Sequence, residues 1–267
     1  LFPYTTLFRS VFLAICLIRR VPLIFDARHM RYYLAMGWIG LALPNTNMVF
    51  VMRELPVALM GVIIITAPVI TYVVALIIRL ETFTPMRAAG VVLGFAGAAV
   101  LVLPRGSLPS PELLPIALLA FVTPALWATS NVIAEVWRPK DGDTFALAMG
   151  TMFTAAFGAL VVALVTGTFH PIWIDFGPSD WVILAYAGTT VCAFALFYTI
   201  VKLAGAVYLA QVGYLVPLMG VGWGAWFYGE EPTVWLWLAM ALVFAGVALV
   251  NFGKKPAPRK PAAETSD

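Results

Sequence analysis

The polar side chains that would bind a ligand in this sequence are amides, phenols and an indole, set within long apolar stretches. They are, in chain order, Asn45, Asn47, Tyr72, Trp127, Asn131, Gln211 and Tyr214. Gln211 lies three residues before Tyr214, a spacing that places both on one helix face. Trp127 and Asn131, four residues apart, share a face for the same reason. A polar side chain within lipid must face protein or a cavity, so we predict that these residues contact substrate.

Several of these residues also have a structural interpretation, which the sequence leaves open. The amides of Asn45 and Asn47 would equally bond neighbouring helices. Trp127 and Gln211 would equally serve helix packing alone. The sequence does not decide between substrate contact and packing for these four positions.

Two prolines recur inside predicted spans, and two glutamates recur at the loops that follow those spans. Pro68 and Pro217 are expected to kink their helices, either as gating bends in two mobile hairpins or as static kinks that shape packing. Glu81 and Glu230 lie at loops and are expected to cap the helices that follow them. A role of these carboxylates in transport is the alternative.

Groups of residues suited to catalysis, metal binding or nucleotide binding are not found. His29 and His170 are isolated in predicted loops, so neither a metal site nor a histidine-based catalytic set is expected. No glycine-rich loop precedes a Lys-Ser or Lys-Thr pair, so no ATP site is expected. No charged side chain lies near the middle of a complete apolar stretch, which favours a neutral or zwitterionic substrate. We therefore predict no cofactor, no metal and no enzymatic activity.

The composition places these residues in a membrane protein. Of 267 residues, 62% are hydrophobic and 11% are charged, against about 45–50% and about 25% in soluble domains. A bilayer-spanning helix needs about 20 mostly apolar residues. Complete spans are predicted at 31–51, 56–79, 85–103, 111–134, 144–167, 180–201, 206–228 and 233–252, with a shorter apolar piece at 10–18. The predicted fold class is all-α in a lipid bilayer, and basic residues spread over short loops predict no nucleic-acid partner.

An internal repeat relates the two halves of the chain. Residues 63–99 match residues 212–248 without gaps, at a constant shift of 149 residues. The identical pairs are Pro68 and Pro217, Glu81 and Glu230, Thr84 and Thr233, Leu93 and Leu242, Phe95 and Phe244, Ala96 and Ala245, Gly97 and Gly246, and Ala99 and Ala248. Five predicted spans separate the two glutamate loops, so these loops fall on opposite sides of the membrane. The repeats are therefore predicted to be inverted, an arrangement that suits alternating access.

The same shift predicts helices upstream of the first residue. Applied backwards to 111–134 it points to a whole helix, and applied to 144–167 it makes 10–18 the end of a cut helix. We therefore expect a design of five plus five helices, of which eight are complete here and the first is missing. Residues 1–10 resemble translated sequencing-adaptor sequence and are expected to be non-native. The predicted units are 11–103 for the first repeat, 111–252 for the second and 253–267 for a disordered tail.

The distribution of Lys and Arg predicts the orientation. Thirteen of these residues lie on the side of the C-terminal tail, and only Arg53 and Arg105 lie on the other, Arg9 being left aside. Cytoplasmic loops carry the excess of basic residues in membrane proteins. The tail is therefore predicted to be cytoplasmic, in a multi-pass protein of the plasma membrane, the inner membrane of a bacterium.

The two copies of the repeat share a proline, a loop glutamate and a Gly/Ala-rich helix. They read Pro68…Arg79-Leu80-Glu81…Gly90…Gly94-Phe95-Ala96-Gly97 and Pro217…Tyr228-Gly229-Glu230-Glu231…Phe244-Ala245-Gly246. This doubled block resembles the EamA-type transporters of the drug/metabolite transporter superfamily. The resemblance implies a ten-helix plasma-membrane carrier with both termini inside, often exporting amino acids or related metabolites. It also implies a central cavity, lined here by residues 31–51, 56–79, 111–134, 180–201 and 206–228.

Together these observations predict a secondary-active or facilitative transporter. We expect it to export a small neutral or zwitterionic metabolite, such as an amino acid, by rocking of two inverted halves. A multidrug efflux carrier is the alternative among transporters, and a membrane-embedded enzyme or a channel is the alternative outside them. The Gly90-x-x-x-Gly94 and Gly220-x-x-x-Gly224 pairs allow helices to approach closely, within a monomer or across a homodimer.

Overall fold

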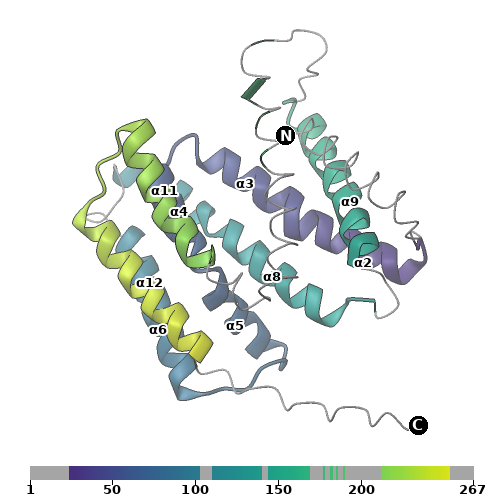
Figure 1. Ribbon diagram of the computed structural model, residues 1–267, viewed down its shortest axis with the longest axis horizontal. Helices are drawn as coiled ribbons and strands as arrows, with labels where there is room; N and C mark the ends of the chain where they lie inside the picture. Colours follow the sequence, from purple (N-terminus) through teal and green to yellow (C-terminus); the bar gives the residue numbers. More distant parts are fainter. Residues whose placement is uncertain are drawn as a thin grey trace, which may run out of the picture.

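The computed structural model describes residues 24–102, 110–139, 144–168 and 212–252, together with five residues between 177 and 189. Every regular element bounded in these ranges is a helix (Figure 1). The elements are α2 (Ala27–Gly37), the π-helix η1 (Trp38–Ala42), α3 (Leu43–Val51), α4 (Val57–Ile64), α5 (Ala67–Ile77), α6 (Pro85–Val102), the 3-10 helix η2 (Pro111–Leu113), α7 (Leu114–Ala120), α8 (Val122–Val136), α9 (Thr144–Val165), α11 (Val212–Tyr228) and α12 (Val234–Phe252).

Five helical segments of the described chain are long and apolar enough to cross a membrane. They are Ala27–Val51, Val57–Ile77, Leu114–Val136, Ala146–Val165 and Val234–Phe252, with Pro85–Val100 as a shorter apolar helix. This bears out the prediction of an all-α protein with several membrane-spanning helices. The predicted span at 206–228 is described from Val212 onward. The apolar piece at 10–18, nearly all of 180–201 and the tail at 253–267 lie outside the described residues.

The first span is a continuous helix made of α2, η1 and α3, and η1 is a π-helical turn within it. It begins at Ala27, earlier than the predicted 31, because Asp26 caps it. Within it the amide of Leu43 bonds the carbonyl of Trp38, five residues back. Pro44 follows at once and has no amide to donate to the helix. A π-type turn beside a proline lets the helix continue with altered winding.

The second span is interrupted where Pro68 predicts a kink. α4 ends at Ile64, residues 65–66 form a turn, and α5 begins directly after it. Pro68 lacks the amide that would bond the Ile64 carbonyl. The hydroxyl of Thr66 donates to the carbonyl of Ile63 at 2.6 Å, so the turn is held by a side chain. The expected kink is therefore a break between two shorter helices.

Pro217, the repeat counterpart of Pro68, has a different setting. It lies inside α11, which is helical without interruption from Val212 to Tyr228. The break at 65–66 thus has no equivalent at 214–215, the positions that match it in the repeat. The two halves differ in backbone conformation at matching places.

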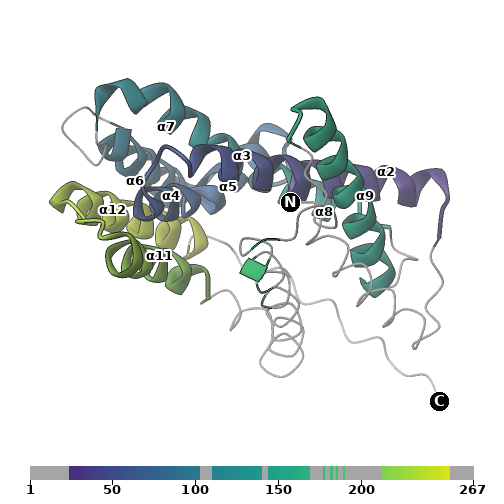
Figure 2. The ribbon, with the colours of Figure 1, turned by 90° about the horizontal axis from the view of Figure 1, so that it is seen from above.

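The line formed by α2, η1 and α3 packs against α7 and α8. The guanidinium carbon of Arg31 lies 4.6 Å from the ring centre of Trp137, and Asn47 bonds the carbonyl of Leu119. The earlier residue of the first span meets the residue that follows α8, and the later one meets α7. The first span therefore runs antiparallel to α7 and α8. Figures 1 and 2 show α2 and α9 toward one end of the molecule and α6, α11 and α12 toward the other.

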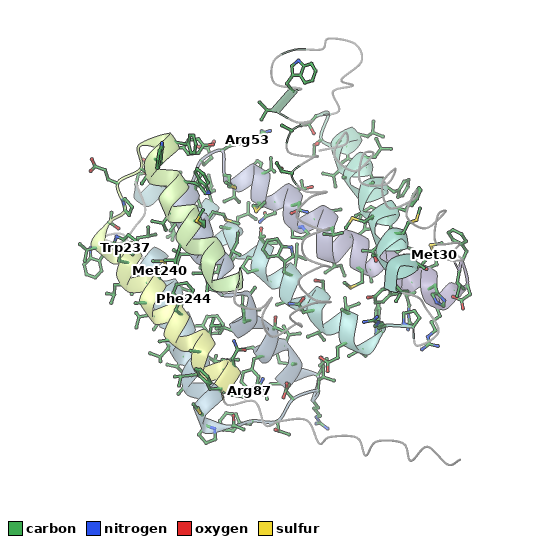
Figure 3. All side chains as sticks on the ribbon, viewed as in Figure 1. Met30, Arg53, Arg87, Trp237, Met240 and Phe244 are labelled. Carbon is green, nitrogen blue, oxygen red and sulfur yellow. The ribbon has the colours of Figure 1, made fainter. Side chains whose placement is uncertain are left out.

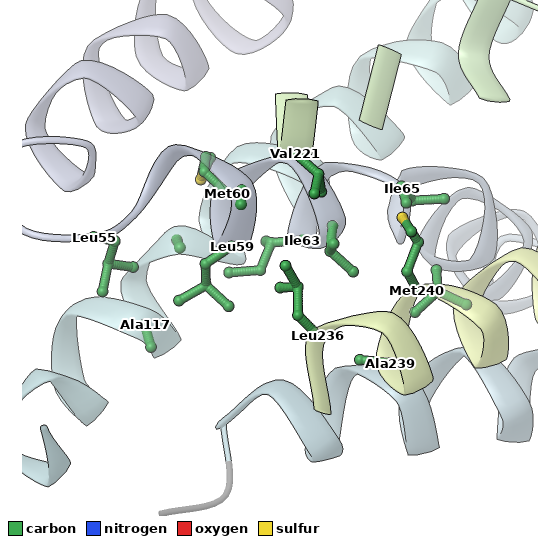
Figure 4. Packing of buried hydrophobic residues seen from close by; sticks show 14 of the residues in the cluster. Leu55, Leu59, Met60, Ile63, Ile65, Ala117, Val221, Leu236, Ala239 and Met240 are labelled. Carbon is green, nitrogen blue, oxygen red and sulfur yellow. The ribbon is translucent and has the colours of Figure 1, made fainter. Parts of the chain in front are cut away.

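An apolar core joins helices from both halves of the chain. Its members in Figure 4 include Leu59, Met60 and Ile63 from α4, Ala117 from α7, Val221 from α11, and Leu236, Ala239 and Met240 from α12. Each of these side chains is at most 4% exposed. Because α4 belongs to the first repeat and α11 and α12 to the second, this core holds the two repeats together.

Glycines bring the backbones of α6 and α12 into direct contact. A Cβ on Gly246 would lie 2.6 Å from the carbonyl oxygen of Gly90 and 2.6 Å from the amide nitrogen of Gly94. A Cβ on Gly97 would lie 2.7 Å from the side chain of Val243. Later residues of α6 therefore meet earlier residues of α12, and the helices run antiparallel. In this position Gly90 and Gly94 serve packing within the chain.

Candidate functional site

Asn131 and Thr71 form a polar contact between α8 and α5. The Asn131 Nδ2 atom lies 3.5 Å from Thr71 Oγ1, and the Thr71 hydroxyl donates to the carbonyl of Ala67 at 2.8 Å. The first distance is at the outer limit of a hydrogen bond. Asn131 is exposed although it lies within an apolar helix, so its amide is held loosely and is able to bind another polar group. Contact of Asn131 with substrate stays a prediction.

Asn47 is engaged in holding helices together. Its Nδ2 donates to the carbonyl of Leu119 at 3.0 Å and to Thr123 Oγ1 at 2.9 Å. The Thr123 hydroxyl donates in turn to the carbonyl of Pro44 at 3.3 Å. Asn47 therefore uses its amide hydrogens to link α3 with α7 and α8. This agrees with the alternative that Asn47 bonds neighbouring helices. Asn45, two residues earlier, is half-buried and points elsewhere around the helix.

Tyr72 belongs to a cluster at the end of α5. Its hydroxyl donates to the carbonyl of Thr82 at 3.2 Å and its ring lies 3.8 Å below the guanidinium carbon of Arg87. Arg87 Nη1 pairs with Glu81 Oε2 at 2.8 Å. Tyr72 is 2% exposed, so it fixes the loop between α5 and α6. Arg87, which is labelled in Figure 3, lies in the first turn of α6.

Sequence reasoning missed this cluster of Tyr72, Arg87 and Glu81. The six-residue spacing between the carboxylate and the guanidinium was its one local signal. That signal was weak because the two charges are separated by a loop rather than carried on one helix.

Trp127 lies four residues before Asn131 in α8, and its contact with substrate stays a prediction. Trp127 is half-buried and its carbonyl accepts a hydrogen bond from Ser130 at 2.9 Å. Ser130 is 5% exposed and faces Gly40 of η1, where a Cβ would lie 3.2 Å from the Ser130 Cβ. Ser130 therefore serves helix packing, while Asn131 on the adjacent position is exposed.

The remaining predicted residues lie at the edge of the described chain. Gln211 lies outside the described residues. Tyr214 and Pro217 lie within α11 by their backbone, and their side chains are outside the described part. Contact of these residues with substrate stays a prediction.

His29 is not in a loop, as the sequence suggested, but in the first turn of α2. It is fully buried, and its Nδ1 lies 2.6 Å from Asp26 Oδ1. The same Asp26 oxygen accepts the His29 amide at 2.7 Å. The amide bond, followed by the bond from the ring, lowers the pKa of Asp26. The prediction failed because the helix begins earlier than the apolar stretch that marks it.

We expect this cap to make stability depend on pH in the acid range. A carboxylate with a lowered pKa stabilises the fold above the ordinary Asp value of about 3.9 and loses its contribution as pH falls through the lowered value. Thermal unfolding in detergent should show the midpoint of the wild type falling more between pH 5 and acid pH than that of Asp26→Asn, whose amide cannot titrate. Equal falls in both proteins would contradict the assignment.

The described polar groups between α5 and α8 are suited to recognition by hydrogen bonds. Within the described ranges no group of His, Cys, Asp and Glu is placed to hold a metal ion. The polar groups between α5 and α8 are an amide and a hydroxyl, which donate and accept hydrogen bonds without exchanging protons at neutral pH.

The fold and the composition of the helices define a multi-pass membrane protein, with polar groups between apolar helices. A model of the EamA-like transporter family matches residues 2–103 and matches again at residues 114–252, which together make up most of the chain. The protein belongs to the EamA-like transporter family, a family of membrane transporters in the drug/metabolite transporter superfamily. This confirms the resemblance carried by the doubled block.

Comparison of structures agrees on the fold. One solved crystal structure, described only as that of a protein, covers 93% of this chain and 85% of its own with a TM-score of 0.58 and 22% sequence identity. At that identity the likeness concerns the fold alone. No curated protein matches the chain in sequence.

Proposed function

We propose that the protein is a secondary-active or facilitative carrier that exports a small neutral or zwitterionic metabolite, such as an amino acid, by alternating access between two inverted halves. The observation that carries this proposal is the antiparallel contact of α6 with its repeat counterpart α12. Residues 85–102 of α6 correspond to 234–251 of α12 under the shift of 149 residues. Repeat copies that run in opposite directions are what inverted halves require.

A second pair of repeated features supports the same proposal. The amide of Glu81 bonds the carbonyl of Ala75 at 3.3 Å, and the amide of Glu230 bonds the carbonyl of Gly224 at 3.1 Å. Both bonds span six residues and occupy matching positions in the repeat. The turn after α5 and the turn after α11 therefore share this hydrogen bond, and the glutamate that donates it, at matching positions.

The difference at the two prolines supports an exchange of conformations. The helix that contains Pro68 is broken at 65–66, whereas the helix that contains Pro217 is continuous. In alternating access each half takes up in turn the conformation of the other. On this proposal the two prolines are gating positions, and the break moves from one half to the other during the cycle.

Exposed aromatic side chains support a position of the end of α11 and the start of α12 at a membrane–water interface. Trp226, Phe227 and Tyr228 at the end of α11 are each at least 66% exposed, and Trp235 and Trp237 at the start of α12 are about half exposed. Trp and Tyr gather at membrane–water interfaces. We infer that this end lies at the extracytoplasmic interface of a bacterial inner membrane, with the C-terminal tail on the cytoplasmic side.

Counterflow in liposomes tests the proposed activity. Purified protein is reconstituted, the vesicles are loaded with unlabelled neutral amino acids, and entry of labelled amino acids is followed. A carrier shows saturation and faster entry when the opposite side is loaded. Flux that rises linearly with concentration, without stimulation by the loaded side, would refute the carrier proposal.

We expect Asn131→Ala and Asn47→Ala to separate substrate contact from packing. Loss of the exposed Asn131 amide should raise KM about tenfold, the effect of one hydrogen bond to a charged ligand group, and leave the melting temperature unchanged. Loss of Asn47 should instead lower stability by about 1–3 kcal/mol, because Thr123 and the Leu119 carbonyl lose their partner. Unchanged transport by both variants would show that Asn131 does not contact substrate.

A further inference from the structure

Glu230 caps a helix from the opposite repeat. Its Oε1 accepts the amide of Val57 at 2.7 Å and its Oε2 accepts the amide of Ala58 at 3.0 Å. These amides begin α4, where backbone N–H groups have no partner within the helix and a negative charge is stabilised. Pro56, the residue before α4, provides no side-chain cap of its own. The expectation that Glu230 caps the helix after it is wrong, because Thr233 takes that place, accepting the amide of Leu236.

The end of α11 is shaped to admit this carboxylate. Gly229 has φ of +63°, a conformation that turns the chain sharply after the helix and that glycine adopts freely. A Cβ on Gly224 would overlap Glu230 Oε2, so the absence of a side chain there makes room for the carboxylate. The same Cβ would lie 3.5 Å from the amide nitrogen of Ala58. Gly224, Glu230 and the start of α4 therefore form one packed unit.

This unit lies at one end of a helix pair that joins the two repeats. α4 and α11 also meet at Gly61 and Gly220, where a Cβ on Gly220 would lie 3.8 Å from the Gly61 Cα. The pair runs antiparallel, and Val221, beside Gly220, is 3% exposed in the core between the repeats. When two halves of a carrier rock apart at this end, the Glu230 bonds must break before Val221 meets water.

We propose that the Glu230 carboxylate is the latch that holds the extracytoplasmic end of the α4–α11 pair closed. The proposal rests on the proposed carrier function and adds the contact that sets the balance between closed and open states. A carboxylate suits this task, because its two bonds to backbone amides form only when α4 and α11 are together. Water replaces those amides once the helices part. A static cap that only completes α4 would instead affect stability and leave the open state unchanged.

Accessibility of a cysteine at position 221 tests the latch. In a background of Cys16→Ser and Cys192→Ser, Val221→Cys is labelled with a membrane-impermeant maleimide in right-side-out and inside-out vesicles. Glu230→Gln, which keeps the shape and removes the charge, should raise the labelling rate about tenfold from the extracytoplasmic side. Gly224→Ala should do the same without changing any charge, because its Cβ displaces the carboxylate. Gly220→Cys, whose Cβ fits without a clash, serves as a second reporter.

Glu231→Gln is the matched control, because Glu231 is exposed beside the latch and should leave the rate unchanged. Labelling that stays at the wild-type rate in both Glu230→Gln and Gly224→Ala, or that rises only from the cytoplasmic side, would overturn the latch. An equal rise in Glu231→Gln would also overturn it, since loss of negative charge alone would then be the cause. The labelling rate is measured without substrate, so it is independent of the counterflow experiment that tests the carrier itself.

Discussion

Gly246→Ala should destabilise the protein by about 1–3 kcal/mol, the usual effect of adding a methyl group to a filled contact. The new Cβ would meet the Gly90 carbonyl oxygen and the Gly94 amide nitrogen, each at 2.6 Å. These atoms belong to a helix backbone and cannot turn aside as a side chain does, so α6 and α12 must move apart. Thermal unfolding of the purified protein in detergent measures the change.

Gly222→Ala is the control for this substitution. Gly222 also lies within a helix, but a Cβ there meets no atom within 4 Å. Alanine favours helix over glycine by about 0.8–1.0 kcal/mol, so this variant should be as stable as the wild type or more so. If Gly246→Ala and Gly222→Ala unfold at the same temperature, the contact between α6 and α12 does not limit stability.

Glu81→Ala should lower stability by about 2–4 kcal/mol, because it leaves the guanidinium of Arg87 buried without its carboxylate. Arg87 is 6% exposed and its Nη1 lies 2.8 Å from Glu81 Oε2. The side chain of Glu81 is 27% exposed, which places the expected effect below the upper end for a fully buried pair. The measurement is again the unfolding midpoint in detergent.

Two further variants separate the ion pair from general effects of charge. Arg87→Met should be less harmful than Glu81→Ala, since the partly exposed carboxylate left behind is hydrated. Arg79→Gln removes an exposed positive charge from the same loop and should change stability by less than about 0.5 kcal/mol. A smaller loss in Glu81→Ala than in Arg87→Met would contradict the proposed role of the pair.

Hydropathy predicts the first and last residues of a helix well where the apolar stretch and the helix have the same length. The predicted span at 233–252 corresponds to α12, which runs from Val234 to Phe252. At the first span the apolar pattern begins late, because the first turn of α2 is polar and is fixed by Asp26 and His29. Pro68 predicts a bend at the second span. The structure has a break there, at a turn where the Thr66 hydroxyl bonds the Ile63 carbonyl.

The roles of polar residues were harder to predict, because each role depends on which groups of the neighbouring helices the side chain meets. Asn47 and Asn131 are both amides within apolar stretches, yet one meets Thr123 and the other is exposed. Glu230 binds amides more than 170 residues away in sequence, and no local pattern marks such a partner. Its counterpart Glu81 pairs with Arg87, six residues away in the same repeat, so matching glutamates of the two halves have contacts of different range.

The glycine contact between α6 and α12 joins two copies of the same repeated helix through matching positions. Under the shift of 149 residues Gly97 corresponds to Gly246 and Gly90 to Ala239. The contact of Gly90 with Gly246 is therefore matched by that of Gly97 with Ala239, whose carbonyl oxygen would lie 2.9 Å from a Cβ on Gly97. An interface of this kind is isologous, as in twofold dimers. Two half-length chains carrying this face would already have a way to pair, so gene fusion would join partners that could recognise one another beforehand.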